Sequence, residues 1–496
     1  MLARMAMLIG EIFRRNADVV PHAVAASLGE DTLTHAELET RGNRIARALR
    51  AAGIRRGDRV VSWADTSLEV LPLFVGLAKL GAVFAPLNAR LGPAEASDVA
   101  RLARARLIVA DPAHAQAALT VAKAAGIGDT AQLGGGGPGL DLRRAAGQGD
   151  STCPACPELR EEDPHVLFFT SGSTGRPKGV VLSHRANYLR SFQGVFRDVP
   201  ERSVCMFPLF HMAAFTLALS AWQTRGEIVF VDVASAEALL GAVERHRANR
   251  LYCIPAVWAR ILAADLDRFD TSSLRELDTG TSATPIELIR ALKQRFPGTL
   301  TRIYYGSTEA GSATTLPDLD VLRKPGSVGA PSPGVDLSLT AEGEIRVRSD
   351  YLMDGYFDDP DATAVALRDG WFHTGDRGAL DEEGHLQVVG RLKEIIRSGG
   401  ESIAPAEVEA VLADHPDVLE VAVVGVPDPS WGEVVCAVVV AEPDTAPTLE
   451  ALQAHCAGRL AGFKKPRRLE CVAALPRTPA TGQVQRALLV EQILAR

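Results

Sequence analysis

The sequence predicts an α/β protein with a large N-terminal domain, which ends in a β-rich subdomain, and a small α+β C-terminal domain. Helix-like segments alternate with strand-like runs from about residue 33 to residue 314, a pattern typical of sheets covered by helices. Beyond Gly326 the pattern changes to successive strand-like runs. A last unit of about 100 residues follows Arg391. The 496 residues are enough for two or three core-bearing units.

The first α/β segment is predicted to begin with a helix over residues 34–52. Thr34 can cap this helix, and Glu37 stands three residues later, which is the spacing of a capping box. A second helix is expected over residues 68–80. Strands are expected at residues 57–62, 82–86 and 107–110.

Two stretches predict irregular structure. The glycine run 134–137 has no strand before it and no helix after it, so we expect a surface loop rather than a phosphate cradle. Residues 147–164 are acidic and rich in turn formers, and they predict a linker between subdomains. A second α/β segment runs from Val166 to about Thr314.

The C-terminal domain is expected to begin at Arg391–Lys393, so that the two domains span residues 1–390 and 391–496. It opens with a helix that has Pro405 in its first turn, a position where proline is favoured. A second helix is expected over residues 449–460. Strands are expected before this domain at 335–340, 343–348 and 386–389, and within it at 421–424 and 434–441.

Composition excludes several classes of protein. The net charge of −8 disfavours non-specific binding to nucleic acid or to an anionic membrane. No apolar run reaches the roughly 18 residues of a membrane-spanning helix. The N-terminal apolar stretch is too short for a signal peptide and predicts an amphipathic helix. Seven cysteines without framework spacing indicate a reducing, cytoplasmic compartment.

The strongest motif lies between two strand-like runs, at residues 166–169 and 179–183. Its glycines let backbone N–H groups approach an anion, its hydroxyls donate hydrogen bonds, and its lysine adds a positive charge. The motif differs from the P-loop of ATPases, because Pro177 precedes the lysine and a strand follows it. The alternative is a plain Ser/Gly turn. The candidate phosphate-binding residues are Thr170, Ser171, Gly172, Ser173, Thr174, Gly175 and Lys178.

This loop resembles the phosphate loop of the adenylate-forming superfamily, which includes acyl- and aryl-CoA synthetases, luciferases and the adenylation domains of peptide synthetases. Further motifs that resemble those of the family follow in the same order across essentially the whole chain. The resemblance implies that ATP converts a small carboxylic acid to acyl-AMP and that CoA then takes up the acyl group. It also implies Mg²⁺ as a cofactor.

Three further motifs are implied to bind the nucleotide. In the first, Tyr305 would lie against adenine, Thr308 would bond phosphate, and Glu309 would coordinate Mg²⁺, a hard ion that prefers carboxylate oxygen. In the last, the carboxylate of Asp376 would accept bonds from both ribose hydroxyls. Taken alone, Glu309 would be an ordinary surface acid. The nucleotide-binding residues that these motifs imply are Gly280, Thr281, Ser282, Tyr304, Tyr305, Gly306, Ser307, Thr308, Asp376 and Arg391.

The remaining motifs concern motion, CoA and the acyl group. By resemblance, Lys393 stands at the hinge about which the mobile C-terminal domain rotates between the two half-reactions. Loop residues Ser398, Gly399 and Gly400 would then border CoA, where the alternative is a plain turn. His211 would line the acyl site, although a lone histidine among apolar residues is also often a core residue. The implied acyl-pocket residues are His211, Met212, Val257, Gly306 and Ala310.

The acyl-pocket motif also limits the class of substrate. Relatives that activate amino acids carry an aspartate there, and none lies between Pro208 and Phe215. Most of the implied pocket residues are small or apolar. We therefore expect a neutral acyl or aryl tail rather than an amino acid or a dicarboxylate.

One position departs from the family pattern. Where the family has a catalytic lysine that reaches the acyl carboxylate and the α-phosphate, this sequence has Gln483, in a loop about one residue longer than usual. Glutamine keeps an N–H donor and loses the charge, which predicts slow adenylation. Three explanations of glutamine at position 483 stay open: an engineered trap, a natural variant that receives its acyl-AMP or works slowly, or compensation by Lys464, Lys465 or Arg486.

Three functions stay open from the sequence. The first is a CoA ligase, and the second is an enzyme that loads a carrier protein in trans or stops at the adenylate. The third is a nucleotide-binding pseudo-enzyme, which rests on Gln483 alone. A homodimer is compatible with all three.

Overall fold

The computed structural model describes residues 6–135, 139–171, 177–192, 199–398, 401–429, 431–457, 459–478 and 482–495. The chain divides into two compact units, which are described separately. The first unit runs to Asp336 and includes Val347–Phe372, and the second comprises Leu337–Arg346 and the chain from His373 onward. The boundary expected at residue 391 and the hinge at Lys393 stay predictions.

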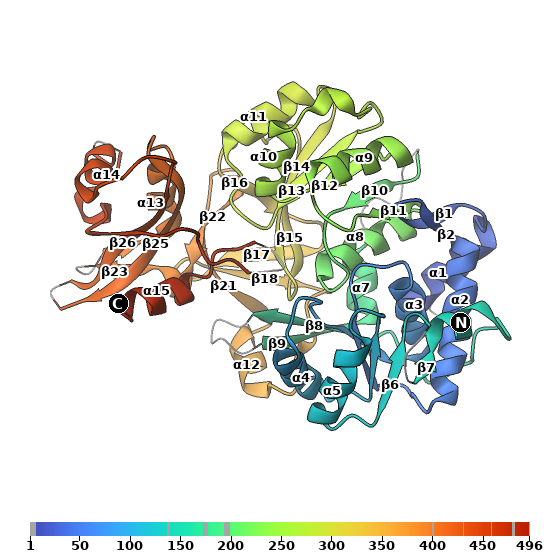
Figure 1. The fold of residues 1–496 in the computed structure, drawn as a ribbon. Coiled ribbons are helices and arrows are strands. Elements are labelled where there is room, and N and C mark those ends of the chain that lie inside the picture. The colour runs from blue at the N-terminus through green and yellow to red at the C-terminus, as the bar shows by residue number, and fades with distance from the viewer. Residues whose placement is uncertain are drawn as a thin grey trace. The chain divides into compact units, whose positions relative to one another are not determined.

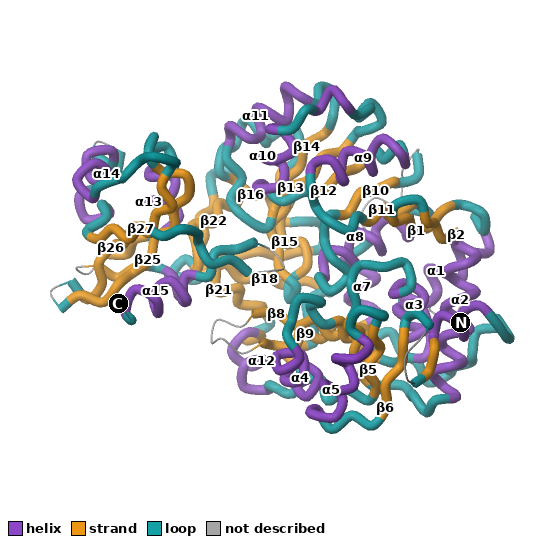
Figure 2. Tube along the Cα trace, in the orientation of Figure 1, coloured by secondary structure: helices purple, strands orange, loops and turns teal. Residues whose placement is uncertain are grey.

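One sheet of the first unit holds the strands of the early α/β segment and the predicted phosphate hairpin. Its order is β19-β9-β8-β4-β3-β5-β6-β7, with parallel pairing in the middle and an antiparallel β8–β9 hairpin at one side. Figure 2 shows helices gathered against these strands. The strands are β3 (Arg59–Trp63), β4 (Val83–Pro86), β5 (Leu107–Ala110), β6 (Asp129–Gln132), β7 (Leu140–Asp141), β8 (Pro164–Ser171), β9 (Pro177–Ser183) and β19 (Gly355–Tyr356). The helices near them in the chain are α2 (His35–Ala51), α3 (Val70–Leu80), α4 (Pro93–Leu102), α5 (Ala115–Ala125), α6 (Leu142–Gly147), α7 (His184–Arg190) and α12 (Pro360–Ala366).

A second sheet of the first unit runs in the order β2-β1-β11-β10-β12-β13-β14-β15-β16. Figure 1 shows α9, α10 and α11 beside strands β12 to β14. The strands are β1 (Val24–Leu28), β2 (Asp31–Thr34), β10 (Arg202–Cys205), β11 (Glu227–Phe230), β12 (Arg250–Tyr252), β13 (Glu276–Gly280), β14 (Leu300–Ser307), β15 (Gly311–Leu316) and β16 (Ser327–Pro331). The helices are α1 (Ile9–Val19), α8 (Met212–Gln223), α9 (Ala236–His246), α10 (Pro255–Ala263), the 3₁₀ turn η1 (Leu266–Arg268) and α11 (Ile286–Arg295).

An aromatic core packs the two sheets of this unit together. Phe74 on the wholly buried helix α3 stacks on Phe215 of α8, with ring centroids 4.4 Å apart. Phe84 of β4 meets both rings at 5.5 Å and 5.2 Å. Burying each such ring is worth about 1.5–3 kcal/mol, and the cluster therefore fixes α8 against the sheet that carries the phosphate hairpin.

The second unit contains two sets of strands. One ladder is formed by β17 (Val335–Leu339), β18 (Glu344–Ser349), β21 (Trp371–Leu380) and β22 (Leu386–Arg391), most of whose residues belong to this unit. The pairing of β20 (Leu367–Arg368) with Trp371 and Phe372 at the start of β21 belongs to the first unit. The other sheet has the order β24-β23-β26-β25, with β27 against β26. Its strands are β23 (Ile396–Ser398), β24 (Glu401–Ile403), β25 (Val418–Asp428), β26 (Gly432–Ala441) and β27 (Arg468–Cys471). The helical elements are η2 (Leu392–Glu394), α13 (Pro405–Leu412), α14 (Leu449–His455), η3 (Gly462–Lys464) and α15 (Arg486–Leu494).

The predicted α/β class is confirmed, and so are most of the predicted elements. Thr34 and Glu37 form the expected capping box at the start of α2. The helix expected over residues 449–460 is shorter and ends at His455. The stretch 147–164 follows α6 and leads into β8, and β7 and β8 belong to one sheet. The linker expected there stays a prediction.

Two further outcomes concern loops and membranes. Part of the glycine run at 134–137 lies outside the described residues, and directly after it Asp141 caps the short helix α6 through the N–H of Arg144. Among the described helices, none is long and apolar enough to cross a membrane.

Candidate active site

The turn between β8 and β9 carries the predicted phosphate-binding residues. The strands pair Thr170 with Lys178 and Ser171 with Pro177, so Thr170 and Lys178 lie side by side at the base of the turn. The tip itself, with Gly172, Ser173, Thr174 and Gly175, lies outside the described residues. Lys178 is half-buried, and its Nζ lies 4.6 Å from the centroid of the Tyr356 ring.

The motif from Tyr304 to Glu309 forms the end of β14 and the turn into β15. The register shifts between Tyr305 and Gly306, which is the signature of a β-bulge. A Cβ atom at Gly306 would lie 2.0 Å from the carbonyl oxygen of Gly311, so only glycine fits there. Ser307 accepts a hydrogen bond from the N–H of Ala310 at 3.1 Å, which closes the turn that presents Thr308 and Glu309.

A buried arginine holds this turn from behind. Arg190 of α7 is 3% exposed and donates to the carbonyl oxygens of Thr308, at 2.9 Å, and of Tyr351, at 2.5 Å. Burial lowers its pKa to about 10, and it stays charged at neutral pH. No local pattern in the sequence indicates this role of Arg190, because its contact with Thr308 joins residues 118 positions apart.

A second missed segment, residues 351–357, touches both motifs. The N–H of Met353 donates to the carbonyl oxygen of Glu309 at 2.8 Å, and the hydroxyl of Tyr356 donates to Glu309 Oε1 at 3.1 Å. The N–H of Phe357 donates to the carbonyl oxygen of Gly179 on β9 at 2.7 Å. The structure therefore brings Lys178 and Glu309 to one place through this segment.

The turn predicted to contact adenine follows β13 and lies beside Tyr304. Gly280 pairs with Tyr304, and a Cβ atom at Gly280 would lie 2.3 Å from the carbonyl oxygen of Tyr304. Thr281 has a φ of +67°, which is strained for a β-branched residue, and its hydroxyl donates to the carbonyl oxygen of Gly280 at 2.5 Å. Ser282 is exposed next to it.

A row of aromatic rings leads from this turn to the predicted acyl site. Tyr304 and Tyr252 have ring centroids 6.2 Å apart, Tyr252 and Phe207 5.4 Å, and Phe207 and His211 5.2 Å. Nδ1 of His211 accepts from the N–H of Ala213 at 3.2 Å, and burial lowers the pKa of His211 to about 4. The ring is therefore a neutral member of the row at neutral pH.

The other acyl-pocket residues divide between two apolar clusters. Met212 and Ala310 are buried in the cluster that contains Tyr252, whereas Val257 is buried among α9, α10 and α11. Leu251 and Tyr252 are neighbours on one strand and belong to these two clusters, because side chains alternate across a sheet. Val257 is thus buried in a different apolar cluster from Met212 and Ala310, and its place in the acyl pocket stays a prediction.

Buried ion pairs support the strands beneath the row. Arg250 of β12 donates to Glu201 at 3.0 Å and to Asp278 of β13, and all three side chains are at most 6% exposed. Removing one partner of such a buried pair is costly, because the other charge stays without compensation. These pairs therefore hold β12 and β13 in register under Tyr252 and Gly280.

The residues predicted to bind the ribose, Asp376 and Arg391, lie in the second unit. Asp376 and Arg391 are paired on β21 and β22, and Arg391 Nε lies 2.9 Å from Asp376 Oδ1. Arg391 also donates to the carbonyl oxygen of Thr374 at 3.2 Å. Asp376 is 8% exposed, so its carboxylate is held in one orientation.

The predicted hinge and CoA loop lie in the same unit. Ser398 and Glu401 pair at the base of the β23–β24 hairpin, and Ser398 also pairs with Gly432. Gly399, Gly400 and the side chain of Lys393 lie outside the described residues.

Gln483 is exposed on a turn whose backbone is well held. Its N–H donates to Thr478 Oγ1 at 3.1 Å, and its carbonyl oxygen accepts from the N–H of Thr478 at 2.8 Å. Two of the three cations considered as replacements are engaged by carboxylates. Lys464 pairs with Glu407 at 2.5 Å, and Arg486 pairs with Glu394 at 3.1 Å and Glu409 at 2.7 Å.

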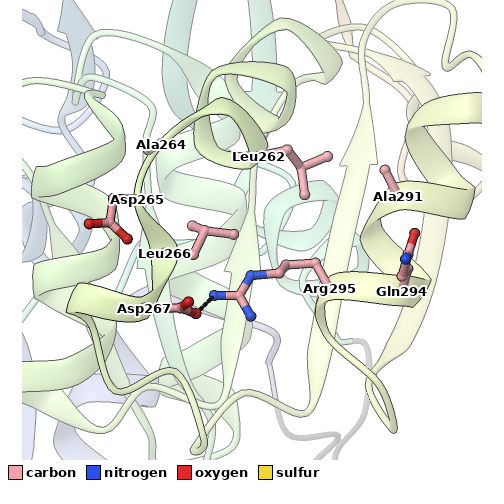
Figure 3. A pocket seen from close by; sticks show the side chains of 8 residues that line it. All are labelled: Leu262, Ala264, Asp265, Leu266, Asp267, Ala291, Gln294 and Arg295. Atoms are coloured by element: carbon pink, nitrogen blue, oxygen red, sulfur yellow. Dashed lines mark hydrogen bonds and ion pairs between the residues drawn. The ribbon is translucent and has the colours of Figure 1, made fainter.

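A shallow surface hollow lies elsewhere on the first unit. Figure 3 shows it between α10, η1 and α11, with Arg295 paired to Asp267 across it. None of the predicted site residues lines it.

Comparison with known proteins finds two family models that match this chain. Residues 13–357 match the model of the family described as AMP-binding enzyme, and residues 407–481 match the model of its C-terminal domain. A feruloyl-CoA synthase of an Amycolatopsis species is 38% identical over 94% of this chain and 95% of its own length. A long-chain-fatty-acid–CoA ligase of Mycobacterium tuberculosis is 31% identical over 98% of this chain and 99% of its own. The structure of an anthranilate CoA ligase in complex with anthranoyl-AMP superposes with a TM-score of 0.89, at 26% identity, over 99% of this chain and 98% of that one.

The chain therefore belongs to the family of AMP-binding, adenylate-forming enzymes. More particularly, it is an enzyme of the acid–thiol ligase class, whose members use ATP and CoA as substrates and pass through an acyl-adenylate.

Proposed function

We propose that this enzyme converts an aromatic carboxylic acid to its CoA thioester in two steps. A carboxylate oxygen attacks the α-phosphorus of ATP and pyrophosphate leaves. The thiol sulfur of CoA then attacks the acyl carbon, and AMP leaves. The observation that carries the proposal is the approach of Lys178 and Glu309, from two hairpins, through the residues around Tyr356.

Each group of site residues has one task. Thr170, Lys178 and Thr308 bind the phosphates, and the turn from Gly280 to Ser282 borders the adenine. Asp376 accepts the ribose hydroxyls, and Arg391 orients its carboxylate through the 2.9 Å contact. Ser398 borders CoA in the second step.

The donor set around Glu309 fits Mg²⁺. This ion takes one or two carboxylates together with phosphate oxygens of the substrate, and keeps several waters. Tyr356 engages Oε1 of Glu309, and among the described residues no hydrogen bond engages Oε2. Bound there, Mg²⁺ would neutralise charge on the phosphates.

The aromatic character of the substrate follows from the row Tyr304–Tyr252–Phe207–His211. Aromatic side chains pack best on an aromatic ligand in stacked or edge-to-face geometry, and the neutral His211 offers no charge that would favour a dicarboxylate. By their names, two of the relatives above act on aromatic acids and one acts on fatty acids. The aromatic row favours an aromatic acid as the substrate of this enzyme.

Adenylation by this enzyme is slow, because Gln483 lacks the charge that would stabilise the transition state. A preorganised donor of this kind is worth roughly 10²–10³ in rate. Arg486 and Lys464 do not replace it, since carboxylates already hold them. Lys465 makes no ion pair with a described residue and is the remaining cation of the three.

The experiment is a substrate panel in two half-reactions. We expect ATP–pyrophosphate exchange to be faster with cinnamate- or benzoate-type acids than with fatty acids of similar size. Synthetic aryl-AMP and CoA should yield aryl-CoA rapidly. A fatty-acid preference would contradict the substrate class, and failure of both half-reactions with every acid would contradict the function.

A further inference from the structure

Tyr356 touches two residues of the nucleotide site at once. Its hydroxyl donates to Glu309 Oε1 at 3.1 Å, and its ring face receives the Lys178 ammonium at 4.6 Å. The two residues stand on different hairpins, and Tyr356 lies 47 positions from Glu309 in the sequence.

Several contacts hold Tyr356 in place. It pairs with Val180 on β9, two residues from Lys178. Its N–H donates to Thr363 Oγ1 at 2.9 Å, and Thr363 lies on α12. Gly355, with a φ of +147°, allows this approach, since a Cβ atom there would lie 2.8 Å from Thr363 Cγ2. The ring is therefore tied to β9 on one side and to α12 on the other.

We infer that Tyr356 is a positioning residue that prepares Glu309 and Lys178 for a metal–nucleotide complex. This inference rests on the proposed function. The Tyr356 hydroxyl donates a hydrogen bond to Oε1 of Glu309 and thereby orients the carboxylate, so that Oε2 faces the cation. The ring holds the ammonium near the same carboxylate without a direct ion pair, which would otherwise compete with the metal.

The opposing explanation is that Tyr356 only packs the fold. Tyr351 supplies the matched control, because it belongs to the same segment and its hydroxyl donates to a carbonyl oxygen, that of Ser312, at 3.1 Å. Tyr351→Phe and Tyr356→Phe each remove one hydroxyl and keep the ring. A structural role predicts similar effects of the two changes on nucleotide binding.

The experiment is calorimetric titration of the full chain with ATP, once with excess Mg²⁺ and once with EDTA. We expect Tyr356→Phe to weaken binding of Mg·ATP about 10-fold, the lower end of the effect of removing a group that orients a metal ligand. ATP in EDTA should bind Tyr356→Phe and the unaltered chain equally. Tyr351→Phe should bind like the unaltered chain under both conditions.

Two further variants separate the two contacts. In a Glu309→Gln background, Tyr356→Phe should cause no additional loss of Mg·ATP binding, because the hydroxyl acts through that carboxylate. Tyr356→Leu should also weaken metal-free ATP binding, by about 3-fold, since Lys178 loses the ring.

The outcomes distinguish this inference from the proposed function. Mg·ATP binding by Tyr356→Phe that equals that of the unaltered chain would overturn the inference alone. So would an equal loss in Tyr351→Phe, or an undiminished effect of Tyr356→Phe in the Glu309→Gln background. An unaltered chain that binds no ATP at all would overturn the proposed function and the inference with it.

Discussion

Replacing Gln483 with lysine should restore fast adenylation. The backbone N–H and carbonyl of Gln483 are both bonded to Thr478, so a new side chain at this position leaves the turn intact. Under the proposed function, lysine would add a positive charge near the two anions that must approach each other, the acyl carboxylate and the α-phosphate. We expect pyrophosphate exchange to rise by about 10² or more, the effect of one charged donor in a preorganised site.

The charges already near this position set the size of the effect. Arg486 stands three residues later, and its guanidinium is held by Glu394 and Glu409. Because Glu394 and Glu409 already hold Arg486, we expect Gln483→Lys to act without any further change at these two carboxylates. Gln485→Lys is the matched control, because it adds the same charge two residues away on the same segment and should leave exchange unchanged.

The assay measures the two half-reactions separately. Exchange of labelled pyrophosphate into ATP reports adenylation, and formation of acyl-CoA from synthetic acyl-AMP reports the second step. Gln483→Lys should raise the first and leave the second within about 2-fold, since only adenylation develops charge at this position. Rapid exchange by the unaltered chain, unchanged by Gln483→Lys, would show that another cation such as Lys465 performs this task.

Three further predictions concern stability, strain and motion. In urea unfolding, the free energy of unfolding should fall as the pH drops from 6.5 toward 4, because the unfolded chain binds more protons than the folded chain in this range. The buried histidines whose pKa is lowered are His35, His165, His184 and His211. Each histidine with a folded pKa of about 4 lowers the free energy of unfolding by about 2 kcal/mol at pH 5, and a flat pH profile would refute this. Thr281→Gly should raise the free energy of unfolding by about 1 kcal/mol, since glycine adopts the φ of +67° without strain, and should weaken ATP binding in the same titration as above. In a Gln483→Lys background, Lys393→Pro should spare pyrophosphate exchange and depress acyl-CoA formation. Equal losses in both half-reactions would argue against a hinge at Lys393.

The sequence by itself determined the features that depend on neighbours in the chain. The capping box of Thr34 and Glu37 and the close approach of Gly306 to Gly311 in the β14–β15 turn are local patterns, because the interacting groups lie a few residues apart. The hydroxyl- and glycine-rich loop that is predicted to bind phosphate is a local pattern too. The order of these motifs was also enough to indicate the family.

The tertiary structure alone decided which distant residues support them. Arg190 and Tyr356 reach the Thr308–Glu309 turn across 118 and 47 positions, and nothing in their immediate sequence indicates a partner. Val257 lies on α10 and is buried in the cluster that contains Leu251, whereas Met212 and Ala310 are buried in the other cluster, so its place in the acyl pocket stays a prediction. Such contacts form only after strands far apart in the chain have paired, and therefore no local pattern carries them.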